Sequence, residues 1–404
     1  MRRNFLIIAL MFISAVVFAQ KETSLNIGGF VRADAIYDTR QNVEAREGYL
    51  ALYPLKPNVD ANGVDINDNG SFSQYAMISR LRVDYRGIDI LKAKTKAYIE
   101  MDFSGASNAN SNTLRLRHAY IEMQWTNVKI LLGQYWHPLT VPEVFPRMLS
   151  LNTGAPFHAF NRSPQMRLDW QTDFGKFVFV TSSQRDFMSP GYESPSVDYL
   201  RNSGLPNLHF QYHVKYNKIY AGVGADWKKI VPRIKTDNNV AVDESISSLS
   251  LIAFAKADFN KFSVRVEGVY GENLFDHLML GGYAVSEYDI DSLQKKYSNI
   301  AHHSVWGDVQ YKFHPQWNAG VFAGYTINLG ASDKIADEIY SRGNDIDYIY
   351  RVAPRVSWKW ENISVIAECE ITTAAYGDLD CFGKITNSKE VTNVRSTLSV
   401  CYNF

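Results

Sequence analysis

The chain has 404 residues, of which 46% are hydrophobic and 13% aromatic, and its 42 lysines and arginines equal its 42 aspartates and glutamates in number. A chain without net charge carries no overall field for nucleic acid, so the composition argues against that class of partner. The three cysteines show neither CxxC nor metal-type spacing, which argues against a cysteine-based metal site.

The amino terminus has the pattern of an export signal. Residues 1–20, MRRNFLIIALMFISAVVFAQ, combine two arginines, an apolar run and small residues before Gln20. We predict a signal peptide over residues 1–19 and an exported domain over residues 20–404. No later stretch approaches the roughly 20 consecutive apolar residues of a membrane-spanning helix. The exported domain is therefore either soluble outside the cytoplasm or crosses a membrane as strands.

Period-two alternation dominates the rest of the chain, and residues 208–227, LHFQYHVKYNKIYAGVGADW, show it most clearly. Apolar and polar residues alternate on both sides of residues 217–218, which predicts two strands joined by a two-residue turn. His209 and His213 would share one face of a helix, but on a strand they lie about 13 Å apart, too far to share a metal. We predict both as polar side chains facing a lumen.

Sixteen segments alternate in this way. They begin near Leu25, Tyr75, Lys92, Thr113, Val128, Pro164, Lys176, Asn207, Lys218, Ile246, Phe262, Ser304, Trp317, Asp347, Asn362 and Thr392. Short connections follow the even-numbered segments and mostly long, polar ones follow the odd-numbered segments. An even strand count with loop lengths segregated to two rims is typical of an outer-membrane barrel. The predicted fold is all-β: a 16-stranded antiparallel transmembrane β-barrel with short periplasmic turns, long outer loops and both termini periplasmic.

Two segments depart from simple alternation. Pro354 falls inside the fourteenth strand, where it removes a ladder donor, so we expect a bulge or a shifted boundary there. The fourth strand changes phase between Leu116 and Ala119, which predicts a bulge near His118.

The connection after strand five, HPLTVPEVFPRMLSLNTGAPFHAFNRS (residues 137–163), is too apolar for a purely solvated loop. At about 16 strands a barrel encloses an aqueous channel, so this loop can pack against the inside of the wall and narrow it. We expect it to fold inward as the constriction, with Glu143, Arg147, His158 and Arg162 projecting into the pore.

Three segments resemble a known family: LRLRHAYIEM (residues 114–123), LLGQYWHP (residues 131–138) and the proline-containing loop that follows. They are similar to Gram-negative porins, most of all to the DcaP-like trimeric porins. The resemblance implies an inward third outer loop, an outer-membrane location and a homotrimer. We expect no periplasmic helical extension like that of such porins, because only a few residues separate the predicted cleavage site from the first strand, and we expect trimerisation through the barrel wall. The last strand, ending at Phe404, resembles the strand by which the barrel assembly machinery recognises its clients.

Basic residues concentrate on the lumen-facing phase of strands two to four. Together with the loop residues, the predicted pore-lining set is Arg80, Arg82, Lys94, Lys96, Arg115, Arg117, Glu143, Arg147, His158 and Arg162. Fixed cations in a confined bore favour anions, so we predict passive diffusion of small hydrophilic solutes with a weak anion preference. The alternative is that these arginines form structural ion pairs with Glu100, Asp102 and Glu143.

Other functions are weighed against the pore. GxSxG is absent and no His and Ser stand on adjacent outward positions, so we predict no enzyme and no catalytic residues. A non-channel barrel acting as an adhesin or structural protein remains the alternative. Half of a calcium-loop pattern, Asp65-x-Asn67-x-Asn69-Gly70, lacks its glutamate because Ala76 stands there, which favours a solvated turn over a calcium site. No metal or other cofactor is expected, and Cys369, Cys381 and Cys401 are interpreted as unpaired small residues.

Overall fold

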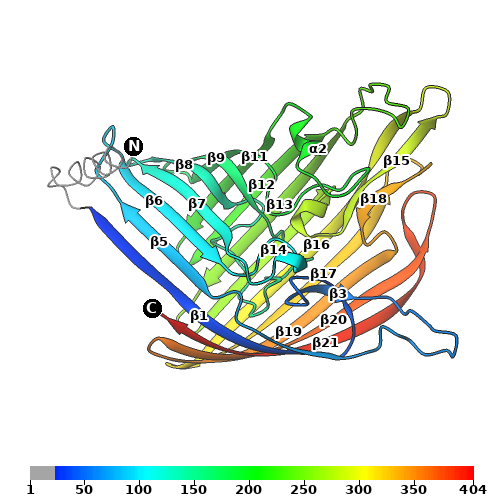
Figure 1. The fold of residues 1–404 in the computed structure, drawn as a ribbon. Helices are drawn as coiled ribbons and strands as arrows, with labels where there is room; N and C mark the ends of the chain where they lie inside the picture. Colours follow the sequence, from blue (N-terminus) through cyan, green and yellow to red (C-terminus); the bar gives the residue numbers. More distant parts are fainter. Residues whose placement is uncertain (1–22) are drawn as a thin grey trace, which may run out of the picture.

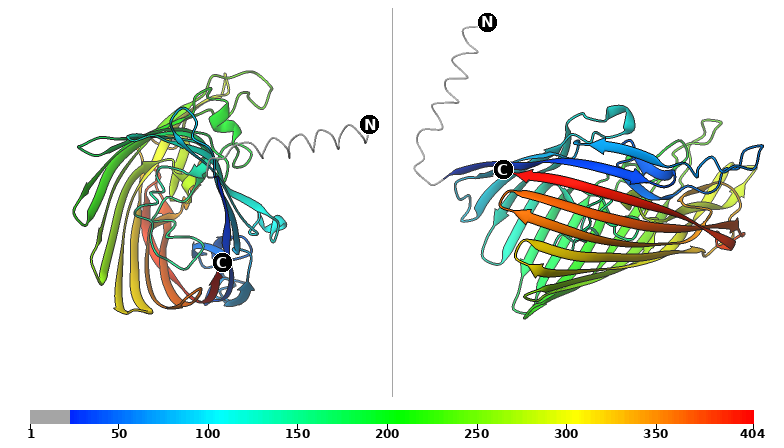
Figure 2. Two further views of the ribbon diagram at one scale, coloured as in Figure 1. Left: turned by 90° about the vertical axis from the view of Figure 1, so that its left-hand side faces the viewer. Right: turned by 90° about the horizontal axis from the view of Figure 1, so that it is seen from below.

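The alternating segments form one continuous sheet in the computed structural model, which describes residues 23–404 (Figure 1). The sheet closes because β1 (Ser24–Asp38) pairs with β21 (Ile385–Asn403), with registers running from Phe30 opposite Asn403 to Asp38 opposite Arg395. Figure 2 shows these two strands side by side. The result is a closed antiparallel barrel of sixteen strands, as predicted. The predicted signal peptide, residues 1–19, lies outside the described residues.

Between β1 and β21, the wall consists of β5 (Arg80–Arg86), β6 (Lys94–Asp102), β7 (Arg115–Gln124), β8 (Val128–Trp136), β9 (Arg162–Gln171), β10 (Lys176–Ser182), β11 (Asn207–Tyr216), β12 (Ile219–Ile230), β13 (Ile246–Asp258), β14 (Phe262–Glu272), β16 (Gln294–His314), β17 (Trp317–Ala331), β19 (Ile346–Trp360) and β20 (Ile363–Leu379). The other elements are β2 (Asn42–Ala45), β3 (Leu50–Pro54), β4 (Ser71–Tyr75), β15 (Gly281–Asp289), β18 (Ile339–Arg342), α2 (Asp198–Arg201) and the 3-10 turns η1 (Asn108–Asn110) and η2 (Phe275–His277). Among the described residues, no helix is long and apolar enough to span a membrane.

The register predicted for residues 208–227 is confirmed. Leu208 pairs with Trp227 and Tyr216 with Ile219 across the two-residue turn. His209 and His213 face the interior and are buried, whereas Leu208 faces outward and is exposed. The same division repeats around the barrel. It leaves an outward apolar band, as an outer-membrane barrel requires.

Of three local details, one agrees with the sequence-based expectations and two differ. The predicted second strand is divided into β4 and β5, which pair with different parts of β1. The bulge in β7 is confirmed: Glu100 pairs with His118 and Met101 with Leu116, so Arg117 has no residue opposite it on β6. The expectation of a bulge or a shifted boundary at Pro354 is wrong, because β19 runs from Ile346 to Trp360 without a register shift there. Pro354 sits opposite Val321 in an unbroken register and faces outward, so the missing N–H does not shift the strand.

The wall is uneven in height. β5 to β10 have 7 to 10 residues each, whereas β16, β20 and β21 have 21, 17 and 19. Two strands therefore start earlier than predicted, β16 at Gln294 rather than near Ser304 and β21 at Ile385 rather than near Thr392. The additional residues form sheet in segments that had been interpreted as outer loops.

Candidate functional site

The connection between β8 and β9, residues 137–161, folds into the barrel as predicted, and we call it the constriction loop. Its apolar members Leu139, Val144 and Phe157 are completely buried. Phe157 packs against Phe322 of β17, with ring centroids 6.1 Å apart. The loop therefore uses the inner wall as its hydrophobic partner, which is what its composition required.

Hydrogen bonds from the wall fix the backbone of the constriction loop. The Glu368 carboxylate on β20 accepts hydrogen bonds from the N–H groups of Leu149 and Ser150 at 2.9–3.0 Å. Arg351 Nη1 on β19 donates to the carbonyl of Ala155 at 2.9 Å. These contacts satisfy loop backbone groups that are sheltered from water, so they cost free energy to break.

A second inward element was missed by the sequence analysis. The β2–β3 hairpin, residues 42–54, lies within the barrel outline in Figure 1, and Tyr49 to Tyr53 are all buried. Arg351 Nη2 donates to the carbonyl of Leu52 at 2.6 Å, and Arg395 Nη1 donates to that of Tyr49 at 3.2 Å. The run YLALY in a loop otherwise read as polar was the signal that could have revealed this hairpin.

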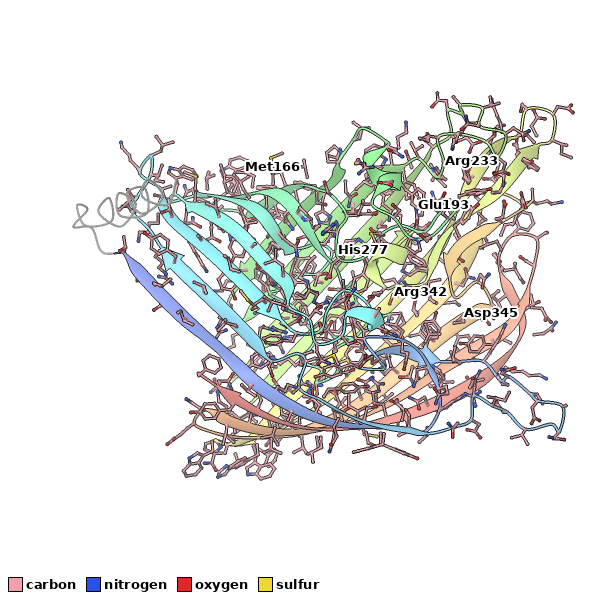
Figure 3. The ribbon with its side chains drawn as sticks, viewed as in Figure 1. Met166, Glu193, Arg233, His277, Arg342 and Asp345 are labelled. Carbon is pink, nitrogen blue, oxygen red and sulfur yellow. The ribbon has the colours of Figure 1, made fainter. Side chains whose placement is uncertain are left out.

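A third inward segment follows β14. Residues 273–280, which include η2, bury Leu274, Met279 and Leu280 almost completely. Figure 3 shows His277 deeper in the barrel than Glu193 and Arg233 of the outer loops. This segment contacts the end of the constriction loop, because Asn161 Nδ2 donates to the carbonyl of Asp276 at 2.7 Å. Sequence reasoning had no signal for this contact between distant loops.

Three of the predicted pore residues form a buried ion-pair cluster instead of lining open space. Arg115 Nη2 lies 2.8 Å from Asp102 Oδ2, Arg117 Nε lies 2.7 Å from Glu100 Oε1, and Arg162 pairs with Asp186. Their side chains are 9% exposed or less. The alternative of structural ion pairs therefore holds for Arg115 and Arg117; Arg162 is paired as well, but with Asp186, which that alternative did not name. In a barrel interior, such pairs cancel each other's charge for a passing ion.

His158 also departs from its expected place. It is completely buried, with Nδ1 2.8 Å from Glu267 Oε1 on β14. The expectation that it projects into the pore is wrong. Its neighbours Phe157 and Ala159 are buried too, so at this end of the constriction loop the side chains on both sides of the backbone are enclosed.

The remaining predicted residues keep contact with solvent. Lys96 and Arg80 are about one-quarter exposed and pair with Asp84 at 3.0 Å and Glu100 at 3.5 Å. Arg82, Lys94 and Arg147 are exposed, and within residues 23–404 no carboxylate oxygen lies within 4.0 Å of their charged nitrogens. The unneutralised charges of the predicted set are therefore cations.

Glu143 is the one carboxylate in the predicted set, and its charge is compensated. Burial alone would raise its pKa, but Lys176 Nζ lies 2.9 Å from Oε1 and holds the pKa at about 2. Lys176 begins β10 beside a short turn, so the constriction loop reaches from the outer rim to the periplasmic end of the wall. Glu143 fixes the loop there as half of an ion pair.

The interior offers little to a metal. The described part of the chain contains no group of three or more His, Cys, Asp or Glu side chains placed to hold an ion. Asp65 of the half calcium pattern already accepts N–H groups from Asn58 and Asn67 and pairs with Arg40 at 2.6 Å. The three cysteines are free.

Gly324 on β17 provides the space in which the constriction loop sits. A Cβ built there would lie 2.5 Å from Phe157 Cγ, which is too close. We expect Gly324→Val to displace Phe157 and to lower the free energy of unfolding in detergent by about 1–3 kcal/mol, as overpacking does. Gly268→Ala is the control, because a Cβ at Gly268 meets only Ser304 O at 3.8 Å. Equal unfolding curves for the two variants would show that Phe157 does not anchor the loop.

A closed sixteen-stranded barrel with an outward apolar band and an inward loop after the fifth strand has the architecture of outer-membrane porins. No family model and no curated protein matches the sequence. Among solved structures, the fold is similar to the outer-membrane channel DcaP of Acinetobacter baumannii, with 17% identity, 96% of this chain and 99% of that chain covered, and a TM-score of 0.69.

Two more solved porins share the fold. The anion-selective porin from Comamonas acidovorans has 8% identity, 95% and 100% coverage and a TM-score of 0.56. OmpF of Salmonella typhi, solved with daunomycin, has 9% identity, 94% and 97% coverage and a TM-score of 0.54. The likeness to DcaP-like porins predicted from the sequence is confirmed at the level of the fold.

Proposed function

We propose that this protein is an outer-membrane porin through which small hydrophilic solutes diffuse passively, with a weak preference for anions. The fold shared with DcaP and OmpF supports the channel. The anion preference is supported by one observation: the unneutralised charged side chains of the predicted pore set, Arg82, Lys94 and Arg147, are all cations. A related barrel, the Comamonas porin, is described as anion-selective.

The preference for anions has a physical reason: the carboxylates are neutralised by basic side chains, whereas some basic side chains are left unpaired. Asp102 and Glu100 are 7% exposed or less and are held by arginines, and Glu143 is held by Lys176. Buried pairs present little net charge to the lumen, whereas an exposed guanidinium lowers the barrier for an anion. The effect is weak because lumenal water and salt screen the exposed cations.

The partners of the protein are part of the same proposal. Lipid covers the outward apolar band, and solutes occupy the lumen. We propose a homotrimer that associates through the barrel wall and assembly by the barrel machinery through the strand that ends at Phe404. We propose transport without catalysis, since the sequence has no GxSxG motif and no His and Ser on adjacent outward positions.

Planar-bilayer recording of the purified protein tests the proposal. We expect stepwise currents and, under a KCl gradient, a reversal potential of the sign that chloride permeation gives. The preference should decline as salt rises, because the Debye length falls from about 10 Å at 0.1 M to about 3 Å at 1 M. A cation-selective reversal potential would contradict the anion preference. Absence of any current step would contradict the channel and favour a non-channel barrel. Esterase or peptidase turnover by the same preparation would contradict the absence of catalysis.

A further inference from the structure

Three histidines from three separate elements meet inside the barrel. His137 begins the constriction loop, His209 lies on β11 and His277 lies in the inward segment 273–280. The ring centroids of His137 and His277 are 4.4 Å apart, and those of His137 and His209 are 6.0 Å apart. All three side chains are at most 5% exposed. We call these three residues the histidine clasp.

Few charges accompany the clasp. Asp226 Oδ2 on β12 lies 2.9 Å from His209 Nδ1 and 3.6 Å from His137 Nε2. Asp276 Oδ1 lies 2.5 Å from Lys228 Nζ, and Asp276 Oδ2 lies 3.6 Å from His277 Nε2. Arg342 of β18 donates to the carbonyl of Phe275 at 3.4 Å and interacts electrostatically with Asp276. Two carboxylates, one ammonium and one guanidinium give no net charge when the imidazoles are neutral. Each proton that these imidazoles take up therefore creates a buried excess of positive charge.

One more titratable group faces the clasp from the wall. His302 on β16 is completely buried, interacts electrostatically with His277, and has no hydrogen-bond partner at either ring nitrogen. His209 Nε2 and His277 Nδ1 also lack partners. Buried nitrogens without an acceptor have nothing to receive the proton that they would carry in the charged form. At His277, this arrangement penalises protonation more than burial alone.

The clasp holds both ends of the constriction loop. At the start of the loop, His137 Nε2 lies 2.9 Å from Asn207 Nδ2, and Gln211 donates to the carbonyl of Pro138 at 2.8 Å. At its end, the N–H of Phe160 donates to the carbonyl of His277 at 3.0 Å. The loop, the segment 273–280 and the wall strands β11 and β12 therefore meet at this one point.

Burial sets the direction of the pH response. Burial, and then the adjacent His277, hold the pKa of His137 well below its usual range. The pKa of His277 is lowered by burial, although Asp276 opposes the shift. An imidazole whose pKa is lowered in the closed arrangement favours that arrangement at pH values above its pKa in water, about 6.5. This stabilisation is lost as the pH falls below that value. Each such imidazole shifts the closed-to-open ratio by up to about tenfold per pH unit.

We propose that His137, His209 and His277 are positioning residues that clasp the constriction loop to the wall at neutral pH and release it in acid. This inference rests on the proposed channel function for its electrical consequence only. In acid, the loop becomes mobile, and the single-channel current switches among several levels. At neutral pH, the current is steady at one level.

Two readouts test the clasp on the intact protein. The first is hydrogen–deuterium exchange of residues 138–160 at about pH 7.5 and about pH 4.5, corrected for intrinsic exchange. We expect protection to fall by at least about tenfold in acid, more than in the wall strands. The second is single-channel recording at the same pH values. Unchanged protection of the loop in wild type at about pH 4.5 would overturn the proposal, whatever the current does.

Variants separate titration from a merely structural role. His137→Asn with His277→Asn removes two imidazoles and leaves amides of similar reach, so loop protection should no longer depend on pH. His303→Asn is the matched control, because His303 neighbours His302 but faces outward and is exposed. It should respond to pH as wild type does.

A wild-type pH response in the double variant would overturn the clasp. If acid-sensitive protection were found without any current at neutral pH, the clasp would stand and the channel function would fail.

Discussion

Replacing Arg351 by alanine is expected to raise the single-channel conductance, because this one side chain holds two of the three inward elements, the constriction loop and the β2–β3 hairpin. Its Nη1 and Nη2 donate to the carbonyls of Ala155 in the constriction loop and Leu52 in the β2–β3 hairpin, at 2.9 and 2.6 Å. Its guanidinium also lies over the ring of Phe157, 5.3 Å from the centroid. Without Arg351, the constriction loop and the β2–β3 hairpin each lose a contact with the wall, and the bore that they occupy widens. Planar-bilayer recording measures the conductance.

The same change should destabilise the barrel. Arg351 Nε lies 3.6 Å from Glu370 Oε2, so Arg351→Ala removes the salt-bridge partner of a buried carboxylate at a cost of about 3–5 kcal/mol. Combining it with Glu370→Ala should recover part of the free energy of unfolding and keep the higher conductance. Arg233→Ala is the control, because Arg233 also pairs with a carboxylate, Glu244, but its other hydrogen bond goes to the carbonyl of Leu293, outside the two elements that Arg351 holds. A folded Arg351→Ala barrel with wild-type conductance would show that other contacts suffice to hold the loops.

The strand order and much of the register could be predicted from the sequence because both depend on local pattern. Period-two alternation assigns each side chain to one face, and a one-residue slip would turn the whole apolar set inward. The two-residue turn at residues 217–218 then left only one pairing, Leu208 with Trp227, which the structure has. The phase change in β7 was equally local and predicted its bulge.

The interior was less predictable because it depends on contacts between distant segments. Alternation showed that Arg115 and Arg117 point inward, but it could not decide between an open lumen and ion pairs with Asp102 and Glu100, which the structure has. The constriction loop could be predicted from its apolar composition. The short apolar run Tyr49–Tyr53 was not recognised, because it lies within a connection that is otherwise polar. Nothing in the sequence around Arg351 marks it as the residue that holds both the constriction loop and the β2–β3 hairpin, since its partners in them lie 196 and 299 positions away.

Arg147 is the residue whose charge should matter most for selectivity. It is the exposed cation of the constriction loop, and it interacts electrostatically with Arg265 on β14 and Asp258 on β13. Because Asp258 also interacts with Arg265 and with Lys256, the local charge that Arg147 joins is positive. An anion that passes the loop therefore meets a cluster of cations at this level.

Arg147→Glu is expected to reverse the selectivity of the channel. One unit charge 4 Å from a permeating ion contributes about 1 kcal/mol in water, so exchanging a cation for an anion changes the energy by about 2 kcal/mol before screening. That is more than tenfold in the local ratio of chloride to potassium, since about 1.4 kcal/mol corresponds to tenfold. The reversal potential under a KCl gradient should change sign. Arg147→Lys should retain the wild-type sign, because it preserves the charge.

Arg201→Glu provides the matched control for this reversal. Arg201 lies on α2 in an outer loop, its side chain is 72% exposed, and it pairs with Asp198 of the same turn. Inverting its charge changes the net charge of the protein by the same amount as Arg147→Glu, so it should leave the reversal potential close to that of wild type. Equal shifts for the two variants would mean that the overall charge sets the selectivity, and the constriction loop would then have no special part in it. A shift confined to Arg147→Glu would locate the selective step at this loop.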